Sequence, residues 1–299
     1  MSVAGASNAA GGSTNGSAGA ASGGTASVAG APGASGGAGG ASPVGGGAGS
    51  GTGGTGGGAT GGAAGAGGTG PAVIPDTKVV MYLPNWSGSF ASWATKIDFT
   101  KMTHLNLAFG TVKSGTNDWS MGASDDIGII NRYQTESNVA PLVANLDALV
   151  KRLDLDGVDV DIERGGSMKS SGNFPKFVNQ LNATFKPEGK LVTAALAQYI
   201  LEDVGSDAIT TAWLNSFDFI NLMIYNKNMA PYTSELSWWK TNKGIPKTKL
   251  TWGVIFDGST SADMVKQITT ASKADGGVMV WELSLDKSGT LWKTVQGAI

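Results

Sequence analysis

Residues Asp156–Glu163 read Asp-Gly-Val-Asp-Val-Asp-Ile-Glu, and this stretch decides the fold. Side chains of an extended strand point alternately to its two faces. One face here is aliphatic and consists of Val158, Val160 and Ile162. The other face carries three acids, which are Asp159, Asp161 and Glu163. Buried like charges raise each other's pKa, so chemistry is the usual reason to keep such a face. A solvated face or a calcium site is the alternative, but calcium loops favour turn residues and carbonyl ligands.

Short apolar runs alternate with segments of helical period on both sides of this stretch. The runs predict strands at Val79–Leu83, His104–Phe109, Val158–Ile162, Leu191–Leu196, Phe219–Ile224, Leu250–Ile255 and Gly277–Trp281. The periodic segments predict helices at Val139–Leu153, Phe174–Phe185, Thr211–Ser216, Ser234–Asn242, Ser261–Lys273 and Leu285–Val295. This alternation predicts an α/β fold, a (β/α)8 TIM barrel with its active site where the strands end. An open doubly wound sheet is the alternative, but no Gly-rich phosphate loop follows the first strand.

The region from Thr111 to Ser137 breaks the pattern, because it has neither a clean apolar run nor a helical stripe. An eight-unit barrel needs its second helix and third strand here. Either Asp118–Ala123 is a poor third strand, or about one strand–helix unit is missing. The barrel is therefore expected to be incomplete at this place, with two unpaired strand edges.

Residues 1–70 differ in composition from the rest of the chain. They consist almost wholly of Gly, Ala, Ser and Thr, and they hold more than half of the 47 glycines. Such a segment has too little apolar surface to offset chain entropy, so we expect a disordered linker or tether. A low-complexity extension without function is the alternative. Residues 71–299 are expected to form one domain, slightly shorter than the ~250 residues typical of a barrel.

The charge balance excludes some partners. With 21 basic and 23 acidic residues the net charge is -2, which favours a neutral partner such as a sugar over nucleic acid. The chain has no cysteine and one histidine, His104, so a multi-histidine metal site is not available. Neither a metal nor a cofactor is expected. No run of 18 apolar residues predicts a membrane span. Met1 does not begin a recognisable secretory signal.

Four acids carry a resemblance to a known family. The signature Asp-x-x-Asp-x-Asp-x-Glu ends the fourth barrel strand of family 18 glycoside hydrolases, and this sequence has Asp156, Asp159, Asp161 and Glu163 at those positions. The other segments that resemble barrel strands of this family are Val79–Trp86, His104–Phe109, Ile220–Asn226 and Gly276–Trp281.

The resemblance implies substrate-assisted retaining hydrolysis next to N-acetylglucosamine. Glu163 would protonate the glycosidic oxygen while the 2-acetamido group of the sugar attacks the anomeric carbon. Asp161 would orient that group, Asp159 would share a proton with Asp161, and Asp156 would support the strand. The expected partner is chitin or another N-acetylglucosamine oligosaccharide. The chain is expected to act as a monomer, extracellular or tethered to a cell surface.

Further residues are assigned through the same resemblance. Tyr225 would donate to the acetamido oxygen, while Trp281 and Tyr82 would offer flat apolar faces to the sugar. Gln198 is a further substrate-binding candidate, and Asn226 stands where many relatives have Asp. Three other tryptophans either line the sugar groove or pack on outer helices, and they are Trp86, Trp238 and Trp239.

The sequence also departs from the family at several places. Ile162 replaces a common aromatic residue, and Arg164-Gly165-Gly166 replaces an aromatic-Pro pair after Glu163. Ser120-Met121-Gly122-Ala123 is a poor match to the third-strand Ser-x-Gly-Gly, and a second alignment uses Arg132-Tyr133-Gln134. Three functions therefore stay open: a chitinase, an endo-β-N-acetylglucosaminidase acting on N-glycans, and a non-catalytic chitin-binding or lectin-like protein.

Overall fold

The computed structural model describes residues 74–112, 116–121, 136–163, 174–199, 211–225 and 228–299. The predicted tether at residues 1–70 lies outside this range and stays a prediction. None of the described helices is long and apolar enough to span a membrane.

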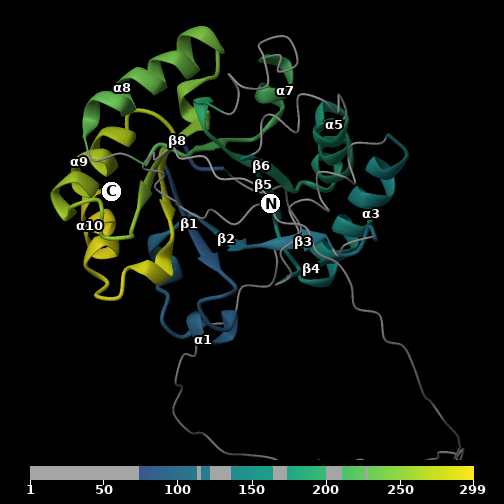
Figure 1. Cartoon of the computed structure of the whole chain (residues 1–299), viewed down its shortest axis with the longest axis horizontal. Coiled ribbons are helices and arrows are strands. Elements are labelled where there is room, and N and C mark those ends of the chain that lie inside the picture. Colours follow the sequence, from purple (N-terminus) through teal and green to yellow (C-terminus); the bar gives the residue numbers. More distant parts are fainter. Residues whose placement is uncertain (1–73, 113–115, 122–135, 164–173, 200–210, 226–227) are drawn as a thin grey trace, which may run out of the picture. The chain divides into compact units, whose positions relative to one another are not determined.

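Seven parallel strands form one sheet that curves into a nearly closed barrel (Figure 1). Their order in the sheet is β2, β1, β9, β8, β7, β6, β5. The strands are β1 (Lys78–Pro84), β2 (His104–Ala108), β5 (Gly157–Asp161), β6 (Leu191–Leu196), β7 (Ile220–Leu222), β8 (Leu250–Ile255) and β9 (Gly277–Trp281). All seven coincide with a predicted strand, so the predicted barrel is confirmed.

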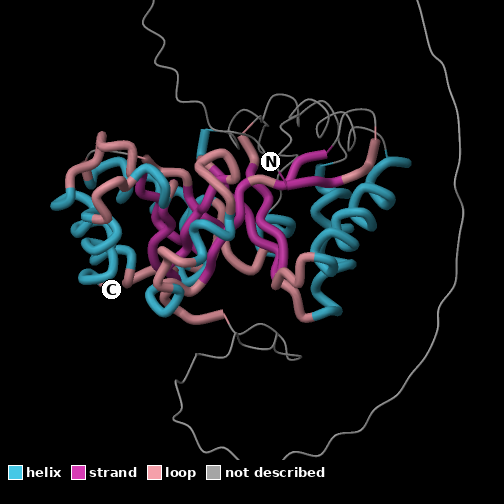
Figure 2. Tube along the Cα trace, turned by 90° about the horizontal axis from the view of Figure 1, so that it is seen from below, coloured by secondary structure: helices cyan, strands magenta, loops and turns pink. Residues whose placement is uncertain are grey.

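Helices lie outside the strands, as Figure 2 shows. They are α1 (Phe90–Ala94), α3 (Glu136–Arg152), α5 (Phe174–Phe185), α7 (Thr211–Ser216), α8 (Met229–Ser237), α9 (Ala262–Ser272) and α10 (Thr290–Ala298). Short 3-10 turns are η1 (Phe99–Lys101), η2 (Lys186–Glu188), η4 (Lys247–Lys249) and η5 (Leu283–Leu285), and η3 (Trp238–Asn242) is a π-helical turn.

Two helix boundaries differ from the prediction for identifiable reasons. Helix α8 begins at Met229, five residues before the predicted Ser234, because Pro231 is tolerated in a first helical turn. Helix α10 begins at Thr290 and not at Leu285. Gly289 has a left-handed φ of 69°, and the Asp286 carboxylate accepts the backbone N–H of Thr290. Together these two features set the start of α10.

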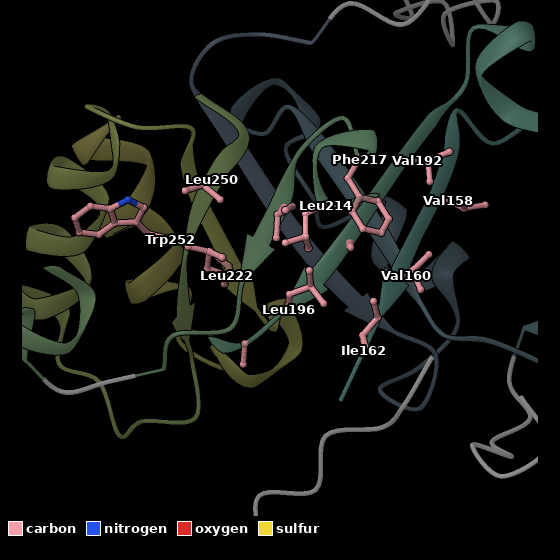
Figure 3. Close-up of a cluster of buried hydrophobic side chains, with 14 of the residues drawn as sticks. Val158, Val160, Ile162, Val192, Leu196, Leu214, Phe217, Leu222, Leu250 and Trp252 are labelled. Atoms are coloured by element: carbon pink, nitrogen blue, oxygen red, sulfur yellow. The ribbon is translucent and has the colours of Figure 1, made fainter. Parts of the chain in front are cut away.

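The alternation of side chains separates two apolar layers. Outward residues of the strands pack against the helices, and Figure 3 shows part of this layer. It includes Val158, Val160, Ile162, Val192, Leu196 and Leu222. A smaller cluster fills the barrel interior and consists of Val80, Tyr82, Ala108, Phe109, Ala195, Phe219, Met279 and Trp281. The strands thus lie between an outer and an inner apolar layer.

The barrel wall is open between β2 and β5, which are the two ends of the sheet. Strand β4 (Trp119–Met121) does not close it, since it pairs antiparallel with β3 (Gly110–Val112). The hairpin packs on α3 through the Trp119 indole, which donates to the Leu142 carbonyl at 2.9 Å. The idea that Asp118–Ala123 is a third barrel strand is therefore wrong for residues 119–121. The Arg132-Tyr133-Gln134 alignment lies outside the described residues.

A cavity of about 280 Å³ lies at this open wall. It is lined by all of β2, by the first half of β5 and by Leu146, Leu149 and Val150 of α3. Four of the five residues of β2 are only half-buried, whereas every residue of β1 and β9 is buried. The prediction of an incomplete barrel with two open edges is confirmed for the described part of the chain.

Candidate active site

The acids of β5 lie in two places. Asp159 points into the barrel interior, and Asp161 and Glu163 lie at the carboxyl end of the strand. Val158, Val160 and Ile162 lie in the outer apolar layer (Figure 3), which turns Asp159 inward, as the alternation predicts. Asp161 ends the strand and is 9% exposed. Glu163 follows two residues later and is half-buried.

Asp159 is held by a network of polar side chains from four other strands. The Tyr82 hydroxyl donates to its Oδ2 at 2.5 Å, and the Thr193 hydroxyl donates to its Oδ1. The Asn221 amide donates to the same Oδ1 at 3.1 Å and also to the Tyr82 oxygen at 3.0 Å. The Thr251 hydroxyl orients that amide by donating to its Oδ1 at 2.8 Å. The Asp159 carboxylate therefore has a fixed orientation beneath Asp161.

Burial raises the pKa of Asp159 above its ordinary value. The three hydrogen bonds from Thr193, Tyr82 and Asn221 oppose this shift because they stabilise the charged form, but desolvation dominates. Asp159 also lines the cavity between β2 and β5, so its exposed surface faces that space. A raised pKa allows this carboxyl to hold a proton under conditions in which an exposed aspartate is ionised.

We expect the stability of Asp159→Asn relative to the parent protein to be greater at neutral than at acidic pH. Because the pKa of Asp159 is raised by folding, the folded protein binds a proton more tightly than the unfolded chain. The stability of the parent protein is therefore highest below the ordinary pKa of about 3.9 and falls as pH rises through the raised value. Asparagine removes this dependence. Urea unfolding of both proteins at pH 4 and pH 7 measures the difference.

Asp263→Asn serves as the control for this comparison, since Asp263 is exposed in the first turn of α9. It removes one carboxylate from an exposed position, so the part of the pH dependence that exceeds that of Asp263→Asn is specific to Asp159. An Asp159→Asn difference that is the same at both pH values would contradict the account.

Tyr225 comes close to the two acids at the carboxyl end of β5. Desolvation, followed by the negative charges of Asp161 and Glu163, raises its pKa well above the usual value. The hydroxyl therefore keeps its proton and can act as a donor. Gly253 on β8 makes room for the ring, because a Cβ there would lie 3.1 Å from Tyr225 Cε1 and 2.3 Å from the Leu222 carbonyl oxygen.

Aromatic rings gather beside these polar groups. The ring of Trp281 lies 5.6 Å from that of Tyr82 and 5.7 Å from that of Phe109. Trp86 stacks on Phe109 at 5.9 Å and is 50% exposed. Tyr82 is almost fully buried, and its hydroxyl is engaged by Asp159. The exposed apolar surface of this group is therefore offered mainly by Trp86.

The other candidate residues are spread more widely. Asp156 is exposed and lies before β5, at the opposite end of the strand from Glu163. Gln198 follows β6, where its backbone N–H donates to the Glu235 carboxylate at 3.2 Å. Trp239 is fully buried and packs in the outer layer. Asn226 and Arg164-Gly165-Gly166 lie outside the described residues.

Sequence reasoning did not assign Thr193, Asn221 and Thr251 to the site. Each is a polar residue inside an otherwise apolar strand, and each is buried. Their interior parity on three adjacent strands is the signal that could have identified them. Within the described residues, no group of three or more metal-ligating side chains gathers as a metal site.

Comparison with known proteins places the chain in a family. The family model described as "Glycosyl hydrolases family 18" matches residues 122–273, which is just over half of the chain. A search among curated proteins returns no match.

Several solved structures with a similar fold are chitinases. A GH18 chitinase from Flavobacterium johnsoniae is 21% identical with a TM-score of 0.62, over 74% of this chain and 93% of that chain. A chitinase from Bacteroides thetaiotaomicron is 16% identical with a TM-score of 0.63, over 75% and 95%. A GH18 chitinase from Cycas revoluta, solved with (GlcNAc)3, is 16% identical with a TM-score of 0.62, over 74% and 99%. The barrel fold is therefore shared with these enzymes, and by the family match the chain belongs to glycosyl hydrolases family 18.

Proposed function

We propose that the chain hydrolyses β-1,4 glycosidic bonds next to N-acetylglucosamine, in chitin or chito-oligosaccharides, by substrate-assisted retaining catalysis. Family membership supports the reaction class. The observation that carries the proposal is the placement of the Tyr225 hydroxyl, whose pKa is raised first by desolvation and then by the nearby charges of Asp161 and Glu163. The proposed acid Glu163, the proposed acetamide-orienting group Asp161 and the Tyr225 hydroxyl thus lie at one end of the barrel, beside the Trp281 ring.

In the first step Glu163 gives its proton to the glycosidic oxygen as the bond to the anomeric carbon breaks. The acetamido carbonyl oxygen of the same sugar forms the new bond to that carbon, giving an oxazolinium ion. Asp161 accepts the acetamido N–H and stabilises the positive charge, while the Tyr225 hydroxyl donates to the acetamido oxygen. Water then attacks the anomeric carbon as the bond from that carbon to the acetamido oxygen breaks, and it gives a proton to Glu163, which restores the acid.

Asp159 serves this reaction from beneath Asp161. Its raised pKa favours a protonated carboxyl, which can donate to Asp161 in the resting site and take part in charge changes there. Tyr82, Thr193 and Asn221 hold it in the required orientation. We therefore assign Tyr82 chiefly to the support of Asp159. Trp281 forms the apolar floor for the sugar, and Gln198 and Asn226 are further proposed contacts.

Chitin is a polymer too large to enter a cell, so this substrate agrees with an extracellular or cell-surface location. In that setting residues 1–70 would tether the catalytic domain of residues 71–299, and the protein would act as a monomer.

The test is to incubate the protein with three substrates: chitopentaose, the same oligomer without acetyl groups, and a high-mannose glycopeptide. We expect cleavage of chitopentaose with the β-anomer formed first by NMR, and no cleavage of the deacetylated oligomer, which lacks the nucleophile. Equal cleavage of the deacetylated oligomer, or an α-anomer formed first, would overturn the mechanism. Cleavage of the glycopeptide alone would identify an endo-β-N-acetylglucosaminidase, and binding without turnover would identify a binding protein.

A further inference from the structure

The loop that follows β1 carries the exposed ring of Trp86 and is fastened on both sides of it. On one side, the Asn85 backbone N–H donates to the Ala108 carbonyl at 2.6 Å, and the Asn85 amide donates to the Phe109 carbonyl at 3.1 Å. On the other side, the Ser87 hydroxyl lies 2.6 Å from the Ser284 hydroxyl oxygen. Trp86 therefore stands between one anchor on β2 and a second anchor on the segment after β9.

The second anchor, the contact between Ser87 and Ser284, continues to the buried carboxylate of Glu282. Glu282 directly follows Trp281 and is only 3% exposed. It accepts the Ser284 backbone N–H at 3.0 Å and the Ser284 hydroxyl at 2.6 Å from Oε2 and 2.8 Å from Oε1. The Glu282 carboxylate thus holds the Ser284 hydroxyl on one side. On its other side the Ser284 hydroxyl is hydrogen-bonded to the Ser87 hydroxyl at 2.6 Å, so Ser284 joins Glu282 to Ser87.

This chain of hydrogen bonds joins the two segments that carry Trp86 and Trp281. The rings are 6.2 Å apart with an interplanar angle of 52°, and both contact Phe109. Capping of η5 explains the bond between Glu282 and the Ser284 N–H, because Glu282 is its N-cap residue. Capping does not explain the link to Ser87, which connects residues 197 positions apart in the sequence.

We propose that Glu282, Ser284 and Ser87 are positioning residues that hold Trp86 against Trp281 as one sugar-binding surface. The exposed ring of Trp86 extends the apolar floor formed by Trp281 toward solvent, where a further N-acetylglucosamine unit stacks its C–H face on it. A loop fixed in advance loses less entropy when an oligosaccharide binds, so the hydrogen bonds act on affinity. This inference rests on the proposed function, since it takes N-acetylglucosamine oligomers as the ligand.

The test measures chitopentaose binding by tryptophan fluorescence in four proteins that all carry Glu163→Gln, so that turnover does not interfere. The four are the Glu163→Gln protein itself and the same protein with Ser87→Ala, with Trp86→Ala, or with both. Ser87→Ala leaves the bonds between Glu282 and Ser284 in place. We expect it to weaken binding about 3- to 10-fold, the usual effect of one lost hydrogen bond. Ser87→Thr keeps a hydroxyl and is expected to restore affinity.

A double-mutant cycle separates positioning from a general structural effect. If the hydrogen bonds act through Trp86, Ser87→Ala has no further effect once Trp86 is alanine. The near-UV circular dichroism of the Trp86 and Trp281 pair should also change in Ser87→Ala and return in Ser87→Thr. Equal losses from Ser87→Ala with and without Trp86, or no loss at all, would overturn the inference. Failure of the Glu163→Gln protein itself to bind the oligomer would instead count against the proposed function.

Discussion

Replacing Glu163 with glutamine is expected to lower kcat/KM on chitopentaose by about 10²- to 10⁴-fold, because the amide has nearly the same shape but cannot protonate the leaving oxygen. Glu163 is half-buried beside Tyr225, so water cannot easily replace the missing acid. The initial rate of chitopentaose cleavage by chromatography is the measurement. Activity equal to that of the parent would exclude Glu163 as the acid.

The leaving group offers a sharper version of this test. A dinitrophenolate leaves without protonation, so Glu163→Gln should lose much less activity on a dinitrophenyl chitobioside than on chitopentaose. Asp161→Asn should instead lose activity on both substrates, because acetamide orientation is needed whatever the leaving group. Glu188→Gln is the matched control, since Glu188 lies in η2 before β6 and pairs with Lys151. Equal losses of Glu163→Gln on both substrates would point to a role other than acid catalysis.

Much of this architecture could be predicted from the sequence, because two simple patterns identify barrel strands. These are short runs of apolar residues and the alternation of apolar and polar residues along a strand. The apolar runs of β6, β8 and β9 give their exact bounds, and the alternation on β5 places Asp159 inward. The polar network could not be predicted in the same way. Thr193, Asn221 and Thr251 are far apart in the chain, and only the order of β6, β7 and β8 in the sheet brings them together.

The sequence predicts that the barrel wall is interrupted here, because the strand–helix pattern has a gap. It does not predict how the residues of this region are arranged. The sequence between β2 and α3 contains the short run around Trp119, and period alone does not say which strand it pairs with. The structure pairs it antiparallel with β3 and fastens it to α3 through the Trp119 indole. Among the described residues no strand lies between β2 and β5, and the cavity there is lined in part by Asp159, so the open wall lies directly beside the site.

The glycine at which an added Cβ would meet the closest backbone atom, among the described glycines, is the site of the prediction with the largest effect on stability. Gly277 begins β9 with φ of 103°, and a Cβ there would lie 2.0 Å from the Lys78 carbonyl oxygen and 2.4 Å from the Lys78 nitrogen. The backbone of Lys78 cannot easily move away from position 277. The ammonium group of Lys78 donates to the Thr248 carbonyl at 2.9 Å and lies 5.5 Å from the centre of the Phe219 ring. An alanine at position 277 must therefore separate β1 from β9.

We expect Gly277→Ala to lower the free energy of unfolding by about 2–6 kcal/mol, from backbone strain of about 1–3 kcal/mol and overpacking of about 1–3 kcal/mol. That is a large part of the ~5–15 kcal/mol that holds a typical domain together. Gly289→Ala separates the two causes, since Gly289 also has a positive φ of 69° but would place its Cβ in open space. It should cost about 1 kcal/mol. Gly297→Ala, in α10 with no close neighbour, should be neutral or slightly stabilising. Urea unfolding of the three variants gives the order of their free energies of unfolding. A Gly277→Ala protein as stable as Gly289→Ala would show that β1 and β9 can move apart at little cost.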